Sequence, residues 1–292
     1  MSAPGQRDAE AACKVVVAGA TLRGSSPRVA SRSEWTRPRR GTYACVTYVC
    51  DHLRLMLLQA ALNGPLTKDD HPAVPVSAHE LARDAAACVA AGAWSVHLHP
   101  RDAEGVERAD GETVDAVVRQ VRAACPAEIS VTTGAWIEPD LDRRLELIRG
   151  WREPDSATVN VSEHGAFAVM EALLAAGVAI EAGVWTTDDA VRLAESGMAD
   201  RVTRILVEPV ELRAADAVAF VDAIHRTIDE LGLGAPRLQH GDGEATWVLI
   251  ADALRRGLAT RVGLEDTLLG PDGEPAAGNA ALVEAARTLR ET

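Results

Sequence analysis

The sequence predicts a (β/α)8 TIM barrel, the α/β fold in which eight parallel strands alternate with eight helices. Short apolar runs alternate strictly with helical patterns from residue 56 onward, which is typical of βαβ units and a parallel sheet. We count eight of each in residues 56–292, and that length is typical of the barrel. A doubly wound sheet is the alternative, but no Gly-x-Gly-x-x-Gly motif follows the first expected strand.

Local signals place the individual elements. Ser77, with Glu80 three residues later, is a capping box that begins the first helix, and Gly92 ends that helix. Glycines also end several later helices. The expected strands are residues 57–62, 94–99, 129–133, 157–161, 179–184, 204–207, 237–239 and 261–264. The expected helices are residues 77–92, 112–124, 140–150, 166–176, 187–196, 214–231, 245–256 and 279–289.

Residues 1–55 differ in composition from the rest of the chain. They hold nine Lys or Arg against four Asp or Glu, and Ser, Arg, Pro and Gly cluster in residues 23–41 without a sustained period. Two explanations fit: a basic, disordered N-terminal extension, or translated upstream sequence before a true start at Met56. We favour the second, and expect a single catalytic barrel domain over residues 56–292.

The composition excludes several classes of protein. The formal net charge of −13 argues against nucleic acid as a partner, because phosphate binding needs a basic patch. The chain has no run of about 18 apolar residues, so we expect no membrane span. Its five cysteines form no Cys-x-x-Cys pair, which is typical of a reduced, cytoplasmic protein.

The block from Val96 to Asp102 organises the predicted site. His97 and His99 lie two residues apart at the end of an expected strand, so their side chains point to the same face. Two imidazoles on one face form half of a metal site, although two packed, hydrogen-bonded histidines would give the same pattern. Glu265, after the eighth expected strand, is the candidate third ligand. Two histidines and one carboxylate leave zinc an open position for substrate.

Further polar residues follow the carboxyl ends of the expected strands, where barrel enzymes carry their active sites. Asp266 is the candidate acid or base, and Arg261 could keep it ionised or bind a substrate carboxylate. Arg101 and Asp102 either orient the histidines or form a surface ion pair. The roles of Glu208 and His240 stay open. The candidate substrate contacts are Thr132, Thr133, Gly134, Asn160, Ser162 and Glu181, the last only if Ile180 and Ala182 point outward.

Four blocks of the sequence carry a family resemblance: residues 68–76, 97–102, 132–134 and 261–266. Together they resemble the β-keto acid cleavage enzyme family, whose named example is the 3-keto-5-aminohexanoate cleavage enzyme, over nearly all of residues 56–292. The resemblance implies a zinc-dependent, oligomeric barrel that exchanges acyl groups between a β-keto acid and acetyl-CoA, releasing acetoacetate and a new acyl-CoA. It also implies zinc ligands His97, His99 and Glu265, a general base Asp266 held by Arg261, and substrate contacts Thr132 and Thr158.

The chain departs from that family at two loops. Members that act on an aminated substrate carry a glutamate after the first strand, where this chain has Asn63, so we expect a substrate with a neutral or differently polar tail. Ala135 and Trp136 follow Gly134 where the compared enzymes have two glycines, which predicts a narrower mouth. Two rival functions stay open: a zinc hydrolase of the amidohydrolase type, and a non-catalytic barrel that binds a metal or metabolite.

Overall fold

The structure is a computed structural model that describes residues 15–17, 46–48 and 57–289 of the 292-residue chain. The chain divides into two units between Leu55 and Met56. In the first unit, β1 (Val15–Val17) and β2 (Val46–Tyr48) pair antiparallel. The hypotheses of a disordered extension and of a start at Met56 concern residues 1–55, of which the structure describes residues 15–17 and 46–48, and they stay predictions.

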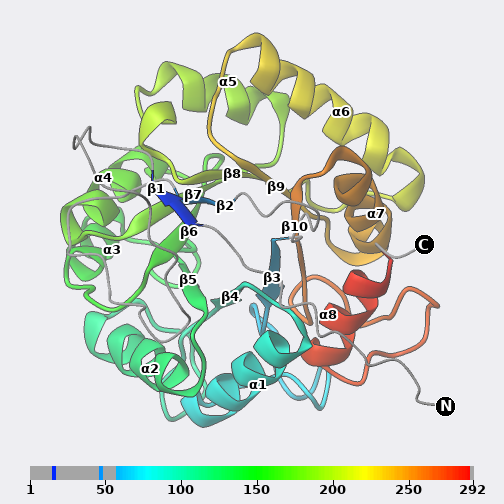
Figure 1. Cartoon of the computed structure of the whole chain (residues 1–292). Coiled ribbons are helices and arrows are strands. Elements are labelled where there is room, and N and C mark those ends of the chain that lie inside the picture. The colour runs from blue at the N-terminus through cyan, green and yellow to red at the C-terminus, as the bar shows by residue number, and fades with distance from the viewer. Residues whose placement is uncertain (1–14, 18–45, 49–56, 290–292) are drawn as a thin grey trace, which may run out of the picture. The chain divides into compact units, whose positions relative to one another are not determined.

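The second unit is a closed barrel of eight parallel strands, which confirms the predicted fold (Figure 1). Consecutive strands are neighbours in the barrel, and β10 closes the ring by pairing with β3. The strands are β3 (Leu58–Ala61), β4 (Ser95–Leu98), β5 (Glu128–Thr132), β6 (Ser156–Asn160), β7 (Ala179–Val184), β8 (Arg204–Val207), β9 (Arg237–Gln239) and β10 (Ala259–Val262). The last strand ends two residues before its predicted end, because a turn begins at Gly263: the N–H groups of Asp266 and Thr267 both donate to its carbonyl.

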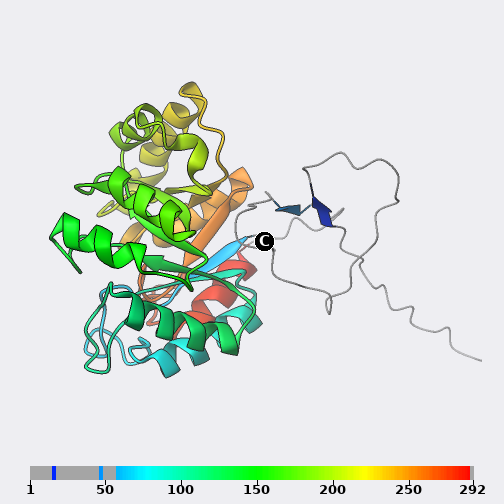
Figure 2. The same ribbon diagram turned by 90° about the vertical axis from the view of Figure 1, so that its left-hand side faces the viewer.

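In the described residues, eight α-helices surround the strands, as Figures 1 and 2 show. The predicted capping box is present, because Ser77 and Glu80 each accept the other's backbone N–H, and Gly92 ends the first helix in the left-handed region. None of the helices in this part of the chain is long and apolar enough to cross a membrane. The helices are α1 (Ala78–Ala91), α2 (Gly111–Ala124), α3 (Leu141–Arg149), α4 (Ala166–Ala176), α5 (Thr187–Glu195), α6 (Ala214–Glu230), α7 (Thr246–Arg256) and α8 (Asn279–Thr288).

Two sets of buried side chains fill this unit. Between strands and helices the core consists mainly of small aliphatic side chains, with Trp151 fully buried. Inside the barrel the contacts are polar: Glu181 of β7 accepts hydrogen bonds from Gln59 of β3 and Ser130 of β5, and lies 3.2 Å from Arg204 of β8. Side chains from these strands meet inside the barrel, so Glu181 points inward. The polar interior leads to the site at the carboxyl ends of the strands.

Candidate metal centre and active site

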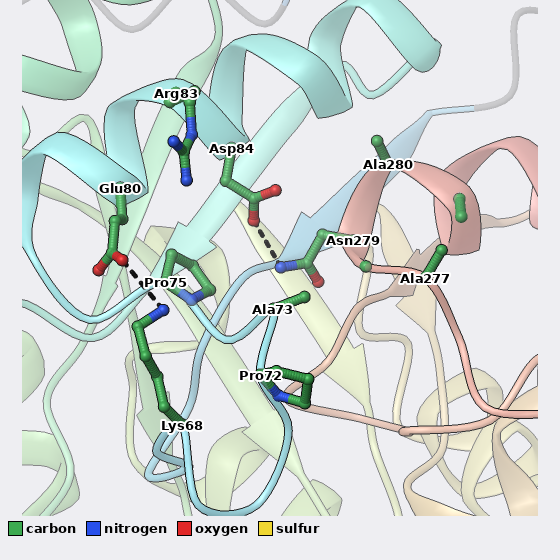
Figure 3. A pocket seen from close by; sticks show the side chains of 12 residues that line it. Lys68, Pro72, Ala73, Pro75, Glu80, Arg83, Asp84, Ala277, Asn279 and Ala280 are labelled. Atoms are coloured by element: carbon green, nitrogen blue, oxygen red, sulfur yellow. Dashed lines mark hydrogen bonds and ion pairs between the residues drawn. The ribbon is translucent and has the colours of Figure 1, made fainter.

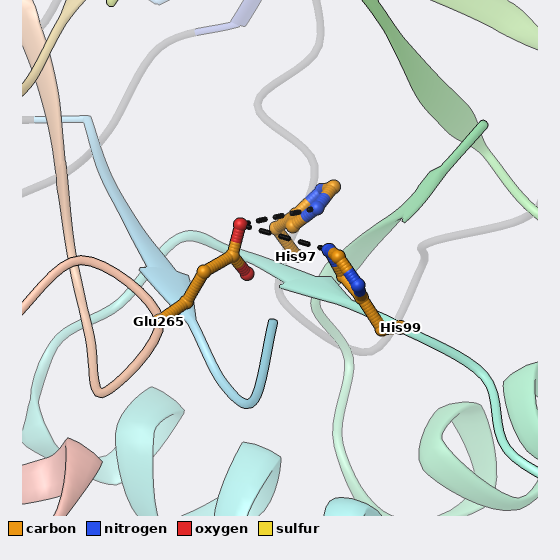
Figure 4. Close-up of side chains that lie close together, drawn as sticks. All are labelled: His97, His99 and Glu265. Carbon is orange, nitrogen blue, oxygen red and sulfur yellow. Dashed lines mark ion pairs between the residues drawn. The ribbon is translucent and has the colours of Figure 1, made fainter. Parts of the chain in front are cut away.

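The three residues of the predicted metal site lie together at the carboxyl ends of β4 and β10 (Figure 4). The Nε2 atoms of His97 and His99 lie 3.8 and 3.7 Å from the same Oε1 atom of Glu265. One ligand atom from each residue lies within 4.8 Å of the others. Both histidines are at most 3% exposed. Side chains that are far apart in the sequence therefore converge on one small volume.

The second nitrogen of each imidazole has its own partner. His97 Nδ1 lies 3.2 Å from the Ser130 hydroxyl, which in turn donates to Glu181. His99 Nδ1 hydrogen-bonds the carboxylate of Glu107. Both Nε2 atoms are therefore left to face Glu265. Partners of this kind fix the orientation and tautomer of the imidazoles in metal sites.

The donor set fits a divalent ion such as zinc. Two imidazole nitrogens and one carboxylate are ligands of many catalytic zinc sites, which keep a fourth position open. Burial lowers the pKa of His97 to about 3, so its ring is neutral and its Nε2 lone pair is free. Burial opposes ionisation of Glu265, but Arg261 and the two histidines hold its pKa well below the ordinary value. Glu265 Oε2 is buried and has no hydrogen-bond partner among the described residues, which a cation would remedy.

The turn after β10 directs two adjacent acids to the barrel mouth. A Cβ at Gly263 would lie 1.8 Å from the Ala61 carbonyl oxygen, so glycine alone fits against β3 at this point. Arg261 then holds both acids: its Nη2 atom lies 2.5 Å from Glu265 Oε1 and 2.7 Å from Asp266 Oδ1. Burial raises the pKa of the Asp266 carboxyl, and Arg261 opposes that rise. The predicted base and the predicted ligand thus share one guanidinium.

Glu208 and His240, whose roles the sequence leaves open, belong to the same polar network. His240 Nε2 lies 2.9 Å from Glu208 Oε2, and the indole N–H of Trp185 donates to Glu208 Oε1 at 3.2 Å. His240 Nδ1 faces Asp266 Oδ1 at 3.7 Å and has no hydrogen-bond partner in the described structure. Both side chains are at most 9% exposed. Glu208 and His240 are therefore buried beside Asp266, and neither lies on a solvated surface.

Arg101 and Asp102 hydrogen-bond the neighbouring loops and not the imidazoles of His97 and His99, so a direct orienting role stays a prediction. Instead they build a hairpin: Asp102 Oδ1 accepts two loop N–H groups and Oδ2 pairs with Arg108. Arg101 donates to the carbonyls of Gly64, Leu66 and Gly105. This hairpin brings Glu107 back to His99. Glu107 was not among the predicted site residues, although the Asp102–Gly105 turn could have indicated that the chain returns toward His99.

Several predicted substrate contacts have partners within the protein. Asn63 is fully buried, and its amide bonds both the N–H and the carbonyl of His99. The Thr133 hydroxyl donates to the Thr158 carbonyl at 2.7 Å, and Thr132 accepts the N–H of Gly134. These residues border the metal site. Their contact with substrate stays a prediction.

The remaining predicted contacts divide between the barrel interior and its rim. Thr158 donates to Glu181 at 3.3 Å, so both belong to the inner network below His97. Asn160 donates to Glu163, which also accepts the N–H of Ala135. Ser162 is exposed and donates to Asp189 at the start of α5, away from the metal residues. Of this group, Ser162 has the weakest structural link to the site.

Two surface pockets lie apart from the metal residues. One of about 370 Å³ is lined by Lys68, Arg83, Asp84 and the start of α8 (Figure 3). The other, of about 460 Å³, is lined by the loops after β3 and β4. They share Lys68 and Glu80, which form a 3.0 Å ion pair. Neither includes a metal ligand.

Comparisons with solved structures support the barrel fold. The complex of ObcA with oxaloacetate aligns with a TM-score of 0.60 at 15% identity, over 74% of this chain and 63% of that chain, which is less than two thirds of its length. A type I 3-dehydroquinate dehydratase from Clostridium difficile aligns with a TM-score of 0.57 at 11% identity, over 81% of this chain and 93% of that one. At such identities the likeness concerns the fold alone.

Comparisons of sequence are more specific. A 3-keto-5-aminohexanoate cleavage enzyme of Fusobacterium nucleatum is 28% identical over 249 residues, covering 79% of this chain and 89% of that protein. The enzyme of the same name from Acetoanaerobium sticklandii is 25% identical over 253 residues, with the same coverage. The family model for the beta-keto acid cleavage enzyme matches residues 56–292, the region that holds the barrel and every residue of the site. The chain therefore belongs to the β-keto acid cleavage enzyme family.

Proposed function

We propose that this protein is a zinc-dependent acyltransferase that converts a β-keto acid and acetyl-CoA into acetoacetate and a new acyl-CoA. The observation that carries the proposal is the shared Arg261 guanidinium, which holds Glu265 toward His97 and His99 and holds Asp266 beside them. Membership of the family supports cleavage of a β-keto acid as the reaction. We assign His97, His99 and Glu265 as metal ligands and Asp266 as general base.

The protein groups divide the work of the reaction. When bound, a divalent ion supplies Lewis-acid polarisation of the keto oxygen. Asp266 removes a proton from the carbon between the keto group and the carboxylate, and Arg261 positions the Asp266 carboxylate for that transfer. Burial raises the pKa of the Asp266 carboxyl, and the positive charge of Arg261 opposes that rise and so favours the ionised form. We assign Thr132, Thr133, Gly134, Thr158, Asn160, Ser162 and Glu181 as substrate-binding or supporting residues, together with Asn63.

The bond changes form a balanced acyl exchange. The carbanion left by deprotonation attacks the thioester carbonyl of acetyl-CoA, which forms a C–C bond and expels the CoA thiolate. The thiolate attacks the original keto carbon, the C–C bond to the former α-carbon breaks, and the new acyl-CoA forms. The carbon chain that leaves takes up the proton held by Asp266 and becomes acetoacetate. No oxidant or reductant is needed.

The first experiment is an assay of acetoacetate release with acetyl-CoA and a panel of β-keto acids with neutral, anionic and cationic tails. We expect turnover that a chelator abolishes and zinc restores. Asp266→Asn should lose at least about 100-fold in kcat, the usual contribution of a general base, while it still binds one zinc ion. Full activity of that variant would refute the assigned mechanism. Bound zinc without acetoacetate from any substrate would favour a hydrolase or a binding protein.

We further propose a cytoplasmic homo-oligomer that binds small molecules. Cys88 and Cys125 are free thiols buried in the core, which supports a reducing compartment. Asn63 is fully engaged by His99, which supports a substrate tail other than a cationic amine at that position. Light scattering of the purified protein measures the oligomeric state.

A further inference from the structure

One carboxylate at the barrel rim contacts both a metal ligand and an exposed tryptophan. Glu107 bonds His99 Nδ1 through Oε1, and its Oε2 accepts the indole N–H of Trp136 at 3.2 Å. The Trp136 ring also stacks on the His99 imidazole, with centroids 6.0 Å apart and planes 27° apart. Trp136 thus contacts the His99 ring directly and is also linked to His99 through a hydrogen bond to Glu107.

The arrangement depends on features of both loops. A Cβ at Gly134 would lie 2.3 Å from the Trp136 ring, so the absence of a side chain lets the indole fold back toward His99. The hairpin of residues 100–108 holds Glu107 from the other side. Trp136 is nevertheless 51% exposed, so core packing does not explain its position. A role in the site explains its position.

We propose that Glu107 and Trp136 are positioning residues for His99, and we name the pair the rim clamp. A carboxylate at Nδ1 keeps the proton on that nitrogen and leaves the Nε2 lone pair directed to the metal. Trp136 holds the Glu107 carboxylate in place through its N–H and covers one face of His99 against water. His97 has a different support, through Ser130 and Glu181 inside the barrel. This inference rests on the metal site of the proposed function and not on its substrate.

The test measures zinc affinity by competition with a chromophoric chelator, with no substrate present. Losing an outer partner of a metal ligand typically costs about 10–100-fold in metal affinity, and we expect that loss in Glu107→Ala. Glu107→Gln should recover part of it, because an amide oxygen still accepts from Nδ1–H. Trp136→Phe keeps a ring beside His99 but loses the N–H, so we expect a smaller, several-fold loss. The matched control is Trp247→Phe, which removes an indole bond to the Leu269 carbonyl, a bond in which no metal ligand takes part.

A double variant separates the direct from the indirect contribution. If Trp136 acts through Glu107, then Trp136→Phe should weaken zinc binding no further when Glu107→Ala is already present. Fully additive losses would overturn the indirect role, and unchanged affinity in Glu107→Ala would overturn the whole inference. The fold is checked by thermal unfolding of the metal-free proteins, which should agree among Trp136→Phe, Trp247→Phe and wild type. Loss of zinc affinity as expected without acetoacetate production would refute the proposed function and leave the rim clamp standing.

Discussion

Replacing Gly64 by Ala should damage the metal site through one contact. Gly64 lies in the loop after β3 with φ of +52°, and a Cβ built there would lie 2.6 Å from Glu265 Cγ. Carbon atoms in contact lie about 3.5–4.0 Å apart, so one of the two must move by about 1 Å. The Gly64 backbone is held, because its carbonyl accepts a 2.9 Å hydrogen bond from Arg101. Glu265 must therefore give way.

The expected loss of zinc affinity in Gly64→Ala follows from how little the metal–ligand distances in a metal site can change. Ligand distances in such sites vary by only about 0.2 Å, so displacing the carboxylate by about 1 Å should weaken zinc binding at least about tenfold. The positive φ adds a separate cost of about 1 kcal/mol in folding stability. Gly243→Ala is the matched control, because its φ is also +52° and nothing lies within 4 Å of the added Cβ. Both variants should lose similar stability in thermal unfolding.

Zinc affinity distinguishes the two alanine variants. We expect chelator competition to give weaker binding for Gly64→Ala and wild-type binding for Gly243→Ala. Wild-type zinc affinity in both variants would refute the reasoning, because it would mean that Glu265 is not a ligand or that its loop moves freely. Equal loss in both would assign the effect to backbone strain instead of the contact with Glu265.

Three further predictions concern stability. Asn279→Ala should cost about 2–4 kcal/mol in urea unfolding, because this fully buried amide bonds Leu62, Leu264 and Asp84. Burial raises the pKa of Glu128 to about 7, so the folded protein keeps a proton there that the unfolded chain loses at lower pH. The free energy of unfolding should therefore fall as pH rises from about 5 to 7. In Glu128→Gln, which cannot titrate at this position, that fall should be smaller by about 1–3 kcal/mol. A ligand that binds only the folded protein stabilises it, so removing zinc with a chelator should lower the melting temperature of wild type but not of His97→Ala, which lacks one predicted zinc ligand.

Local patterns in the sequence predicted most of the fold and brought out the three residues that the structure places together as a possible metal site. The eight alternating strands and helices and the ends of several helices follow from periodicity and glycines, and His97 and His99 share a face because side chains alternate along a strand. Glu181 could not be assigned, since either it or its apolar neighbours could have faced inward. The structure settles that point through contacts from three other strands. Such contacts form only when the barrel closes and brings distant strands together, and a local sequence pattern does not predict them.

Outer partners of the ligands are also beyond local prediction. Ser130 looks like an ordinary strand residue until the barrel interior is known, and Glu107 looks like a charged loop residue. Arg101 and Asp102 directly follow the histidines in the sequence. In the structure they form the hairpin that carries Glu107. Proximity in sequence identified the segment that carries Glu107 but not Glu107 itself.

Small residues explain how the predicted ligands from two separate strands meet. β3 lies between β4, which carries His97, and β10, which precedes Glu265. Ala61 pairs in register with His97, and Gly263 packs directly on the Ala61 backbone. A larger side chain at Gly64 would collide with Glu265 itself. Glu265 can therefore cross over β3 to the histidines only where β3 and its loop present little volume, so the spacing of the predicted metal site is set by residues outside the predicted ligand set.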